Sequence, residues 1–123
     1  MKFVIVYTTT TNRREAERIG QILLRERLVA CVNLVGPITS SYWWNGRIAK
    51  AREVLVLAKT RATLARAVIR KVQAIHSYDV PCVVTWPINQ GNSAFLRWIE
   101  AETSPALRKK GPNPAVRQAG RNG

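Results

Sequence analysis

The sequence is poor in several residue types on which common activities depend. Its 123 residues include one histidine, one methionine, two cysteines and seven acidic residues. Two cysteines are too few for a disulfide framework. A single histidine leaves no readable Ser-His-Asp arrangement, and the chain has neither a glycine-rich phosphate loop nor an apolar run of the roughly 18 residues that span a membrane. We therefore expect a cytoplasmic protein that is not an enzyme and has no membrane segment.

The shortage of acidic residues leaves a large positive charge. Lysine and arginine together number 20, and the net charge is +13. Residues 104–123 hold five of these cations and no acid, so residues 1–103 still carry +8. Such a field attracts nucleic acids, anionic membranes and acidic proteins without any specific site. Two interpretations stay open: a charge that keeps the protein soluble, and nonspecific binding of polyanions, including nucleic acid, through a basic surface and tail.

A change of composition divides the chain near residue 103. Residues 1–103 contain the long apolar runs, whereas residues 104–123 mix prolines and glycines with cations and have almost no large apolar side chains. A segment of this kind cannot bury enough apolar surface to offset its ordering entropy. We predict one domain over residues 1–103 and a disordered basic tail over residues 104–123.

Strand and helix patterns alternate through the predicted domain. Runs of β-branched and aromatic residues predict strands over residues 3–7, 28–44, 47–59 and 80–86. Apolar residues at helical spacing predict helices over residues 13–27 and 61–75, followed by a short last helix. The predicted N-caps are Asn12, with Glu15 three residues later, then Thr60, and finally Asn92 or Ser93. The order β-α-β-β-α-β with a C-terminal helix predicts an α+β, ferredoxin-like sandwich.

Two glycine-containing pairs mark irregular points in the long middle strands. Gly36-Pro37 interrupts the run over residues 28–44 and predicts a bulge or a bend. Asn45-Gly46 separates two strands and predicts a tight hairpin, because both central residues of a type I′ turn adopt positive φ. Cys31 and Cys82 lie in apolar runs, and we expect both to be buried free thiols.

The predicted sheet has helices for only one of its two faces. Two helices cover one face, and the apolar side chains of the other face remain bare. A bare apolar face on a monomer is an association surface. The pattern therefore predicts an oligomer.

Five motifs, taken in order, resemble those of one protein family. They are Leu28-Val29-Ala30-Cys31-Val32-Asn33, Tyr42-Trp43-Trp44-Asn45-Gly46-Arg47-Ile48, Glu53-Val54 with Lys59-Thr60, His76-Ser77-Tyr78-Asp79-Val80-Pro81, and Phe95-Leu96-Arg97-Trp98-Ile99. Their spacing over residues 3–103 resembles the CutA family, the divalent-cation tolerance proteins. The resemblance implies a homotrimer of ferredoxin-like subunits, similar in architecture to PII signalling proteins, with no established catalytic reaction.

The resemblance also implies a metal site for copper or another divalent cation. The candidate ligands are His76 and Cys31, because imidazole and thiolate suit copper. Two structural roles remain as alternatives, a helix cap for His76 and a core thiol for Cys31. Thr8 and Ile75 stand where some family members have a further cysteine and histidine.

A second implied site is a cleft between subunits. Its residues in this sequence are Asn33, Trp44, Glu53, Lys59 and Tyr78. Such a cleft would bind a small ligand or a protein, as in a PII-like signalling or scaffold trimer, or its polar groups would only fix the trimer. The hairpin aromatics Tyr42, Trp43 and Trp44 are the implied trimer interface, since aromatic side chains are enriched in interface cores.

Overall fold

The structure is a computed structural model that describes residues 2–109, and its elements follow the predicted order. The strands are β1 (Phe3–Thr10), β2 (Cys31–Trp44), β3 (Arg47–Arg61) and β4 (Val83–Pro87). The helices are α1 (Arg13–Arg25), α2 (Ala65–Ile75), α3 (Ser93–Glu102) and α4 (Pro105–Lys109), and the 3-10 turn η1 (Ala62–Leu64) precedes α2.

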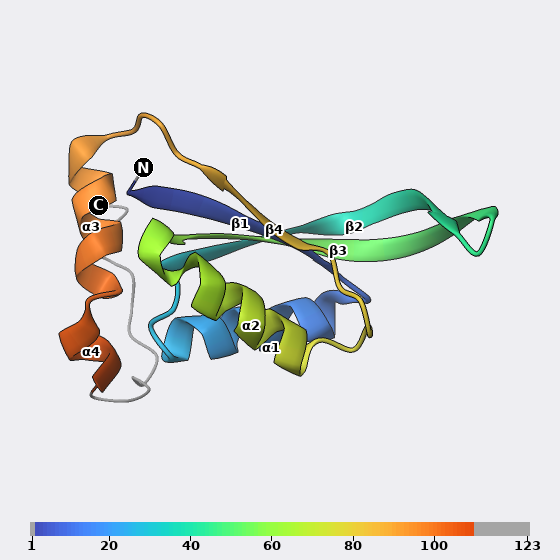
Figure 1. The fold of residues 1–123 in the computed structure, drawn as a ribbon, viewed down its shortest axis with the longest axis horizontal. Helices are drawn as coiled ribbons and strands as arrows, with labels where there is room; N and C mark the ends of the chain where they lie inside the picture. The colour runs from blue at the N-terminus through green and yellow to red at the C-terminus, as the bar shows by residue number, and fades with distance from the viewer. Residues whose placement is uncertain (1, 110–123) are drawn as a thin grey trace.

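The four strands form one antiparallel sheet in the order β2-β3-β1-β4. Helices α1 and α2 lie side by side over one face, and α3 with α4 stands across one end of the sheet (Figure 1). The core lies between that face and the two helices, and its members include Val6, Ile19, Leu23, Val68 and Val72. The element order and the strand order are those of the ferredoxin-like fold, which confirms the predicted fold class.

Strands β2 and β3 continue beyond the rest of the sheet as a two-stranded arm (Figure 1). Asn45 and Gly46 join the strands with φ angles of 50° and 77°. Positive φ at both positions confirms the predicted hairpin turn. We call residues 38–53 the hairpin arm.

The predicted bulge lies where the arm meets the sheet. Val35 pairs with Leu55, and the next pair is Ile38 with Glu53. Between these two pairs β2 therefore contains one residue more than β3. Gly36, within the bulge, has a φ of +149°, and a Cβ there would lie 3.1 Å from the Glu53 carbonyl oxygen. Both the backbone conformation and this close approach require glycine.

The predicted caps of α1 and α3 are confirmed. The Asn12 side chain accepts the Glu15 backbone N–H at 2.9 Å, and Asn92 accepts the N–H groups of Ala94 and Phe95. The Glu15 carboxylate returns to the N–H of Thr11, one residue before the cap.

The predicted cap at Thr60 is wrong. Thr60 lies inside β3, which continues to Arg61 because Phe3 of β1 still pairs with that residue. The Thr60 hydroxyl donates to the Leu28 carbonyl at 2.7 Å. Helix α2 therefore starts four residues later than predicted, after η1, and has no side-chain cap.

Three further expectations need correction or restriction. Both cysteines are free, but Cys31 is only half-buried and Cys82 is exposed, so the expected burial is wrong for Cys82. Strand β4 begins at Val83 rather than at residue 80, and it lies at a sheet edge. The beginning of the predicted disordered tail is the helix Pro105–Lys109, whereas residues 110–123 lie outside the described residues.

The sheet face opposite α1 and α2 carries apolar side chains that no helix among residues 2–109 covers. Val35, Val84 and Trp86 are 45%, 48% and 42% exposed. The Trp86 ring contacts the ring of Tyr7, with centroids 5.9 Å apart. We call this surface (Tyr7, Val35, Leu57, Val84 and Trp86) the open face, and it confirms the predicted bare face. Across residues 2–109, no helix is long and apolar enough to cross a membrane.

The two glycines of the hairpin differ in what surrounds them, and this difference is testable. Gly36→Ala should lower the free energy of unfolding by about 2 kcal/mol or more, because the new Cβ meets backbone atoms in addition to the unfavourable φ. Gly46→Ala should cost only about 1 kcal/mol, because nothing lies within 4 Å of its new Cβ. Denaturant unfolding at one protein concentration measures both. Equal losses would contradict a tight bulge at Gly36.

Candidate functional site

A groove lies between the base of the hairpin arm and the loop that joins α2 to β4. Its volume is about 710 Å³. Five of its lining side chains are aromatic: Tyr7, Tyr42, Trp43, Trp44 and Tyr78. Its carboxyl and thiol groups belong to Glu53, Asp79 and Cys82, and no lysine or arginine of the described chain lines it. The groove therefore combines aromatic surface with negative charge.

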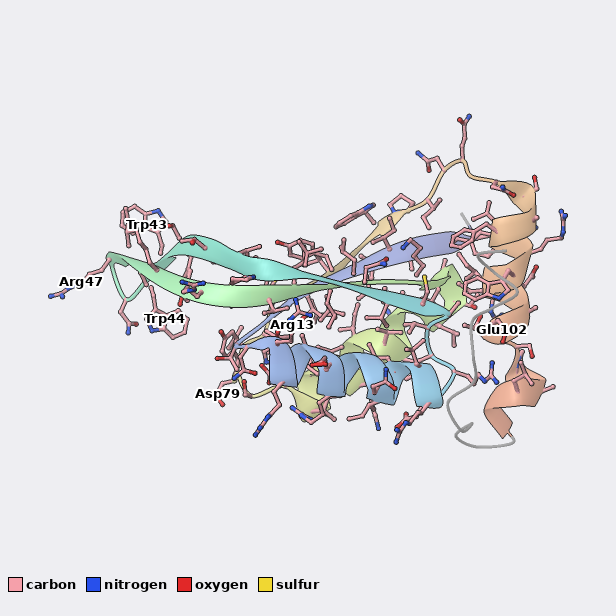
Figure 2. The ribbon with its side chains drawn as sticks, turned by 180° about the vertical axis from the view of Figure 1, so that it is seen from behind. Arg13, Trp43, Trp44, Arg47, Asp79 and Glu102 are labelled. Carbon is pink, nitrogen blue, oxygen red and sulfur yellow. The ribbon has the colours of Figure 1, made fainter. Side chains whose placement is uncertain are left out.

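The hairpin arm supplies the outer part of this groove. Trp43 and Trp44 are neighbours in β2, so they project to opposite sides of the arm, as Figure 2 shows. Trp43 is 72% exposed and pairs with Ile48, which is also exposed. The arm therefore presents large apolar side chains on both of its sides.

A hydrogen bond closes the inner end of the groove. The Tyr78 hydroxyl donates to Glu53 Oε2 at 2.9 Å, and Glu53 is only 7% exposed. Burial raises the pKa of Tyr78, and the hydrogen bond and charge of Glu53 raise it further. The phenol therefore remains a proton donor at neutral pH.

Two of the five predicted cleft residues lie outside the groove. Lys59 Nζ donates to Asn33 Oδ1 at 2.8 Å and lies 3.8 Å from Cys31 Sγ. Lys59 is six residues from Glu53 along β3, which corresponds to about 20 Å of strand. Within one chain the structure brings Trp44, Glu53 and Tyr78 together and places Asn33 and Lys59 in a separate group.

His76 is the C-cap residue of α2, and its ring is held on both sides. Its Nε2 lies 2.8 Å from the Thr9 carbonyl oxygen, which can only accept, so the ring proton is on Nε2. Its Nδ1 accepts the Tyr78 backbone N–H at 3.0 Å. The side chain has no exposed surface. These contacts fix the orientation of the ring and position the loop carrying Tyr78.

Glu15 anchors the same loop from the start of α1. Although it is in the first turn, it is buried, and its two carboxylate oxygens accept the N–H groups of Thr11 at 2.9 Å and Ser77 at 2.7 Å. Burial by itself would raise the pKa of Glu15, but these hydrogen bonds and nearby His76 hold it below the ordinary value of 4.5. An ionised carboxylate therefore ties α1 to the loop that closes the groove.

The two predicted metal ligands do not converge within one chain. Cys31 lies on the same side of the sheet as the open face, where it pairs with Lys59 of β3. His76 instead contacts Thr9, which pairs with Leu55, at a different position along β3. His76 also has both ring nitrogens engaged. Residues 2–109 contain no group of three or more His, Cys, Asp or Glu side chains arranged to hold a metal ion. The donors of a single chain therefore do not fit a divalent-cation site.

Seven groove residues were not among the predicted site residues, and three of them carry a phenol, carboxyl or thiol group: Tyr7, Asp79 and Cys82. Alternation along β1 was the available signal for Tyr7, because it places this side chain on the face opposite Val6. Asp79 and Cys82 lie close to Tyr78 in sequence, but their common orientation depends on how the loop crosses the end of the sheet.

Comparison with known proteins assigns the same family over almost the whole described chain. The family model described as CutA1 divalent ion tolerance protein matches residues 4–102. A chloroplastic CutA 1 protein of Oryza sativa subsp. japonica is 40% identical over 100 residues, which cover 81% of this chain and 56% of that protein. The divalent-cation tolerance protein CutA of Archaeoglobus fulgidus is 43% identical over 95 residues, covering 77% and 92%. The chain thus spans about half the length of the rice relative and nearly all of the archaeal one.

Solved structures of family members share this fold. The crystal structure of CutA1 from Oryza sativa superposes with a TM-score of 0.83 at 38% identity, covering 85% of this chain and 96% of that one. The structure described as the periplasmic divalent cation tolerance protein CutA from Archaeoglobus fulgidus superposes with a TM-score of 0.81 at 40% identity, covering 83% and 99%. Each superposition therefore covers more than four-fifths of this chain.

The anchoring role of Glu15 predicts a specific pH dependence. Glu15→Gln should lower the free energy of unfolding at neutral pH by about 1–3 kcal/mol, because the Ser77 N–H loses a charged acceptor. The folded pKa is below the unfolded one, so this stabilisation is complete above the unfolded pKa and is lost as pH falls through the folded pKa. The difference in melting temperature between the two proteins should shrink well below pH 4.5.

Glu17→Gln is the matched control for this experiment, because Glu17 is exposed on the same helix. Its melting temperature should follow that of the unchanged protein at both pH values. A Glu15→Gln deficit of the same size in acid would contradict the role assigned to the carboxylate charge.

Proposed function

The chain belongs to the CutA1 divalent ion tolerance protein family, and from that premise we propose that it is a homotrimer that binds copper or a similar divalent cation between its subunits. The proposal has two parts, the assembly and the cation site. The observation that carries both is the exposed open face, because it requires a partner and because Cys31 lies on the same face.

The assembly is supported by the extent of exposed apolar surface. The open face presents Val35, Val84 and Trp86, and the hairpin arm adds Trp43 and Ile48. Soluble monomers rarely expose contiguous apolar patches of this kind. Other copies of the chain would cover the open face and the arm, and the family resemblance supplies the number three.

The cation site is supported by donors on the side that would face a neighbour. Cys31 lies beside Asn33 and Lys59 on that side, and the groove holds the carboxylate of Glu53. Thiolates and carboxylates from more than one chain can supply the ligands that a single chain lacks. His76 would contribute only after losing its bonds to Thr9 and Tyr78, so Cys31 is the principal candidate in our proposal.

The groove favours a second candidate, a PII-like signalling or scaffold trimer with a ligand bound in its cleft. Lys59 lies outside the groove, so the lining is aromatic and acidic rather than cationic. Aromatic faces and carboxylates attract cations. A ligand of this groove would therefore be a small cation or a cationic side chain of a partner, and not an anion.

The assembly predicts a mass that one substitution should change. Light scattering after size exclusion should report about three times the chain mass of 13.8 kDa. Trp86→Glu, on the open face, should reduce this mass, because a charge would be buried at the interface. Arg97→Glu, at an exposed position on α3, should leave the mass unchanged. A 13.8 kDa particle for the unchanged protein at micromolar concentration would overturn the assembly.

Copper binding should depend on both the thiol and the assembly. In calorimetric titration with Cu(II), Cys31→Ser should weaken binding at least about tenfold, because a thiolate ligand is lost. Trp86→Glu should weaken it similarly, because the shared ligands separate. His76→Gln should have a smaller effect on the affinity.

Cys82→Ser is the matched thiol control for the copper titration, because it removes the same functional group from the groove. Absence of heat with the unchanged protein would overturn the cation site. Full binding by a monomeric Trp86→Glu variant would show that one chain suffices and would contradict the shared site.

A further inference from the structure

The outer surface of α1 and α2 carries a concentration of arginines. On α1, Arg14, Arg18 and Arg25 are exposed, and on α2, Arg66 and Arg70 are exposed. Spacings of four and eleven residues correspond to about one and three helical turns, so each set forms one stripe along its helix. We call these five residues the arginine stripes. The two helices lie side by side, so the stripes share the face of the molecule opposite the open face (Figure 1).

Most of these arginines have no ion-pair partner within residues 2–109. Arg14, Arg25, Arg66 and Arg70 have no hydrogen bond or ion pair within residues 2–109, whereas Arg18 contacts Glu15 and the Ile75 carbonyl. Helix α2 contains no acidic residue over Ala65–Ile75. An arginine with no intramolecular partner is free to bind an external anion without breaking an existing contact.

The chemistry of the arginine stripes favours binding to phosphate groups without insertion into a membrane. Fourteen of the 20 cations in the sequence are arginine, whose planar guanidinium binds phosphate oxygens in a bidentate manner. All of the large exposed apolar side chains lie on strands or loops, and none lies on α1 or α2 within the described residues. Helices that bind membrane interfaces combine positive charge with an exposed apolar face that inserts into the lipid. α1 and α2 carry the charge but have no exposed apolar face.

The spacing of the stripes matches a polymer of phosphates. Arg14 and Arg25 are about 16 Å apart along the axis of α1. One strand of B-form DNA presents about five phosphates over this length. The stripe on α2 provides a second row beside the first. An extended, regularly charged polyanion can therefore contact several arginines at once, which a single small anion cannot do.

We propose that the arginine stripes of α1 and α2 bind the sugar–phosphate backbone of nucleic acid without reading its sequence. This surface is on the opposite side of the sheet from the open face, so the proposed trimer would leave it accessible and would present it three times. The inference does not depend on the cation site. It assigns to this chain an interaction surface whose binding is electrostatic and decreases with salt.

Fluorescence anisotropy with a labelled DNA duplex of mixed sequence tests the proposal on the full chain. The test variant is Arg66→Gln with Arg70→Gln, because glutamine keeps the helix propensity of arginine. The matched control is Lys2→Gln with Arg97→Gln, which removes two exposed cations elsewhere. Circular dichroism and light scattering establish that both variants keep the fold and mass of the unchanged protein.

The expected result is a specific loss of phosphate contacts. The test variant should bind at least about tenfold more weakly near 0.1 M salt, and its slope of log affinity against log salt should be shallower by about 1.8. The control should retain most of the affinity and the slope. Equal losses in both variants, or no measurable binding by the unchanged protein, would overturn the proposal.

Two competing polyanions distinguish nucleic acid from other partners. Tighter binding to vesicles that contain phosphatidylserine than to the duplex would assign the stripes to membranes and overturn the proposal. Competition by polyglutamate as strong as that by unlabelled duplex would assign them to acidic proteins and overturn it as well. Strong competition by duplex alone, together with the loss in the test variant, would support it.

Discussion

The sheet has two apolar faces and only one layer of helices to cover them. α1 and α2 bury one face around Ile19, Leu23 and Val72, and the opposite face remains exposed at Val84 and Trp86. No second helical layer covers this face within residues 2–109, and soluble monomers rarely leave so much apolar surface exposed to water. The long arm, the groove beside it and Cys31 all lie on the side that would form the interface of the proposed trimer. In the proposed trimer, assembly and ligand binding would therefore be linked through the same surface.

Buried polar groups determine the shape of the groove at the base of the hairpin arm. Glu15 holds the backbone of Ser77, His76 is fixed between Thr9 and Tyr78, and the Tyr78 hydroxyl reaches Glu53. Each of these groups has a partner, which offsets the cost of burying a charge or a hydrogen-bonding group. The histidine that resembles a metal ligand in the sequence is one part of this arrangement. Its contacts account for its position without a bound metal.

Charge is divided between the two sides of the molecule. The groove contains carboxylates and aromatic rings, whereas the helix surface carries unpaired arginines. A net charge of +13 therefore does not describe either surface by itself. The cation proposed for the groove side and the polyanion proposed for the helix side would bind to different faces. The two activities would then be separable by substitution.

Local sequence was sufficient where the determining interactions are local. The turn at Asn45-Gly46, the bulge at Gly36 and the cap at Asn12 depend on backbone conformations that a few neighbouring residues decide. The motifs, taken together, were sufficient for the family and the ferredoxin-like fold. Thr60 shows the limit of local reasoning: it has the composition of a helix cap, but pairing with β1 extends the strand through it.

The candidate site depended on contacts between residues distant in sequence. The sequence by itself determined which residues have suitable chemistry, which segments form strands and helices, and that one sheet face is apolar. Only the tertiary structure separated Lys59 from Glu53, exposed Cys82, and enclosed His76 between Thr9 and Tyr78. The physical reason is that strand register, loop path and the packing of α1 against the loop set these distances. Those quantities arise from contacts across the whole domain and not from any single segment.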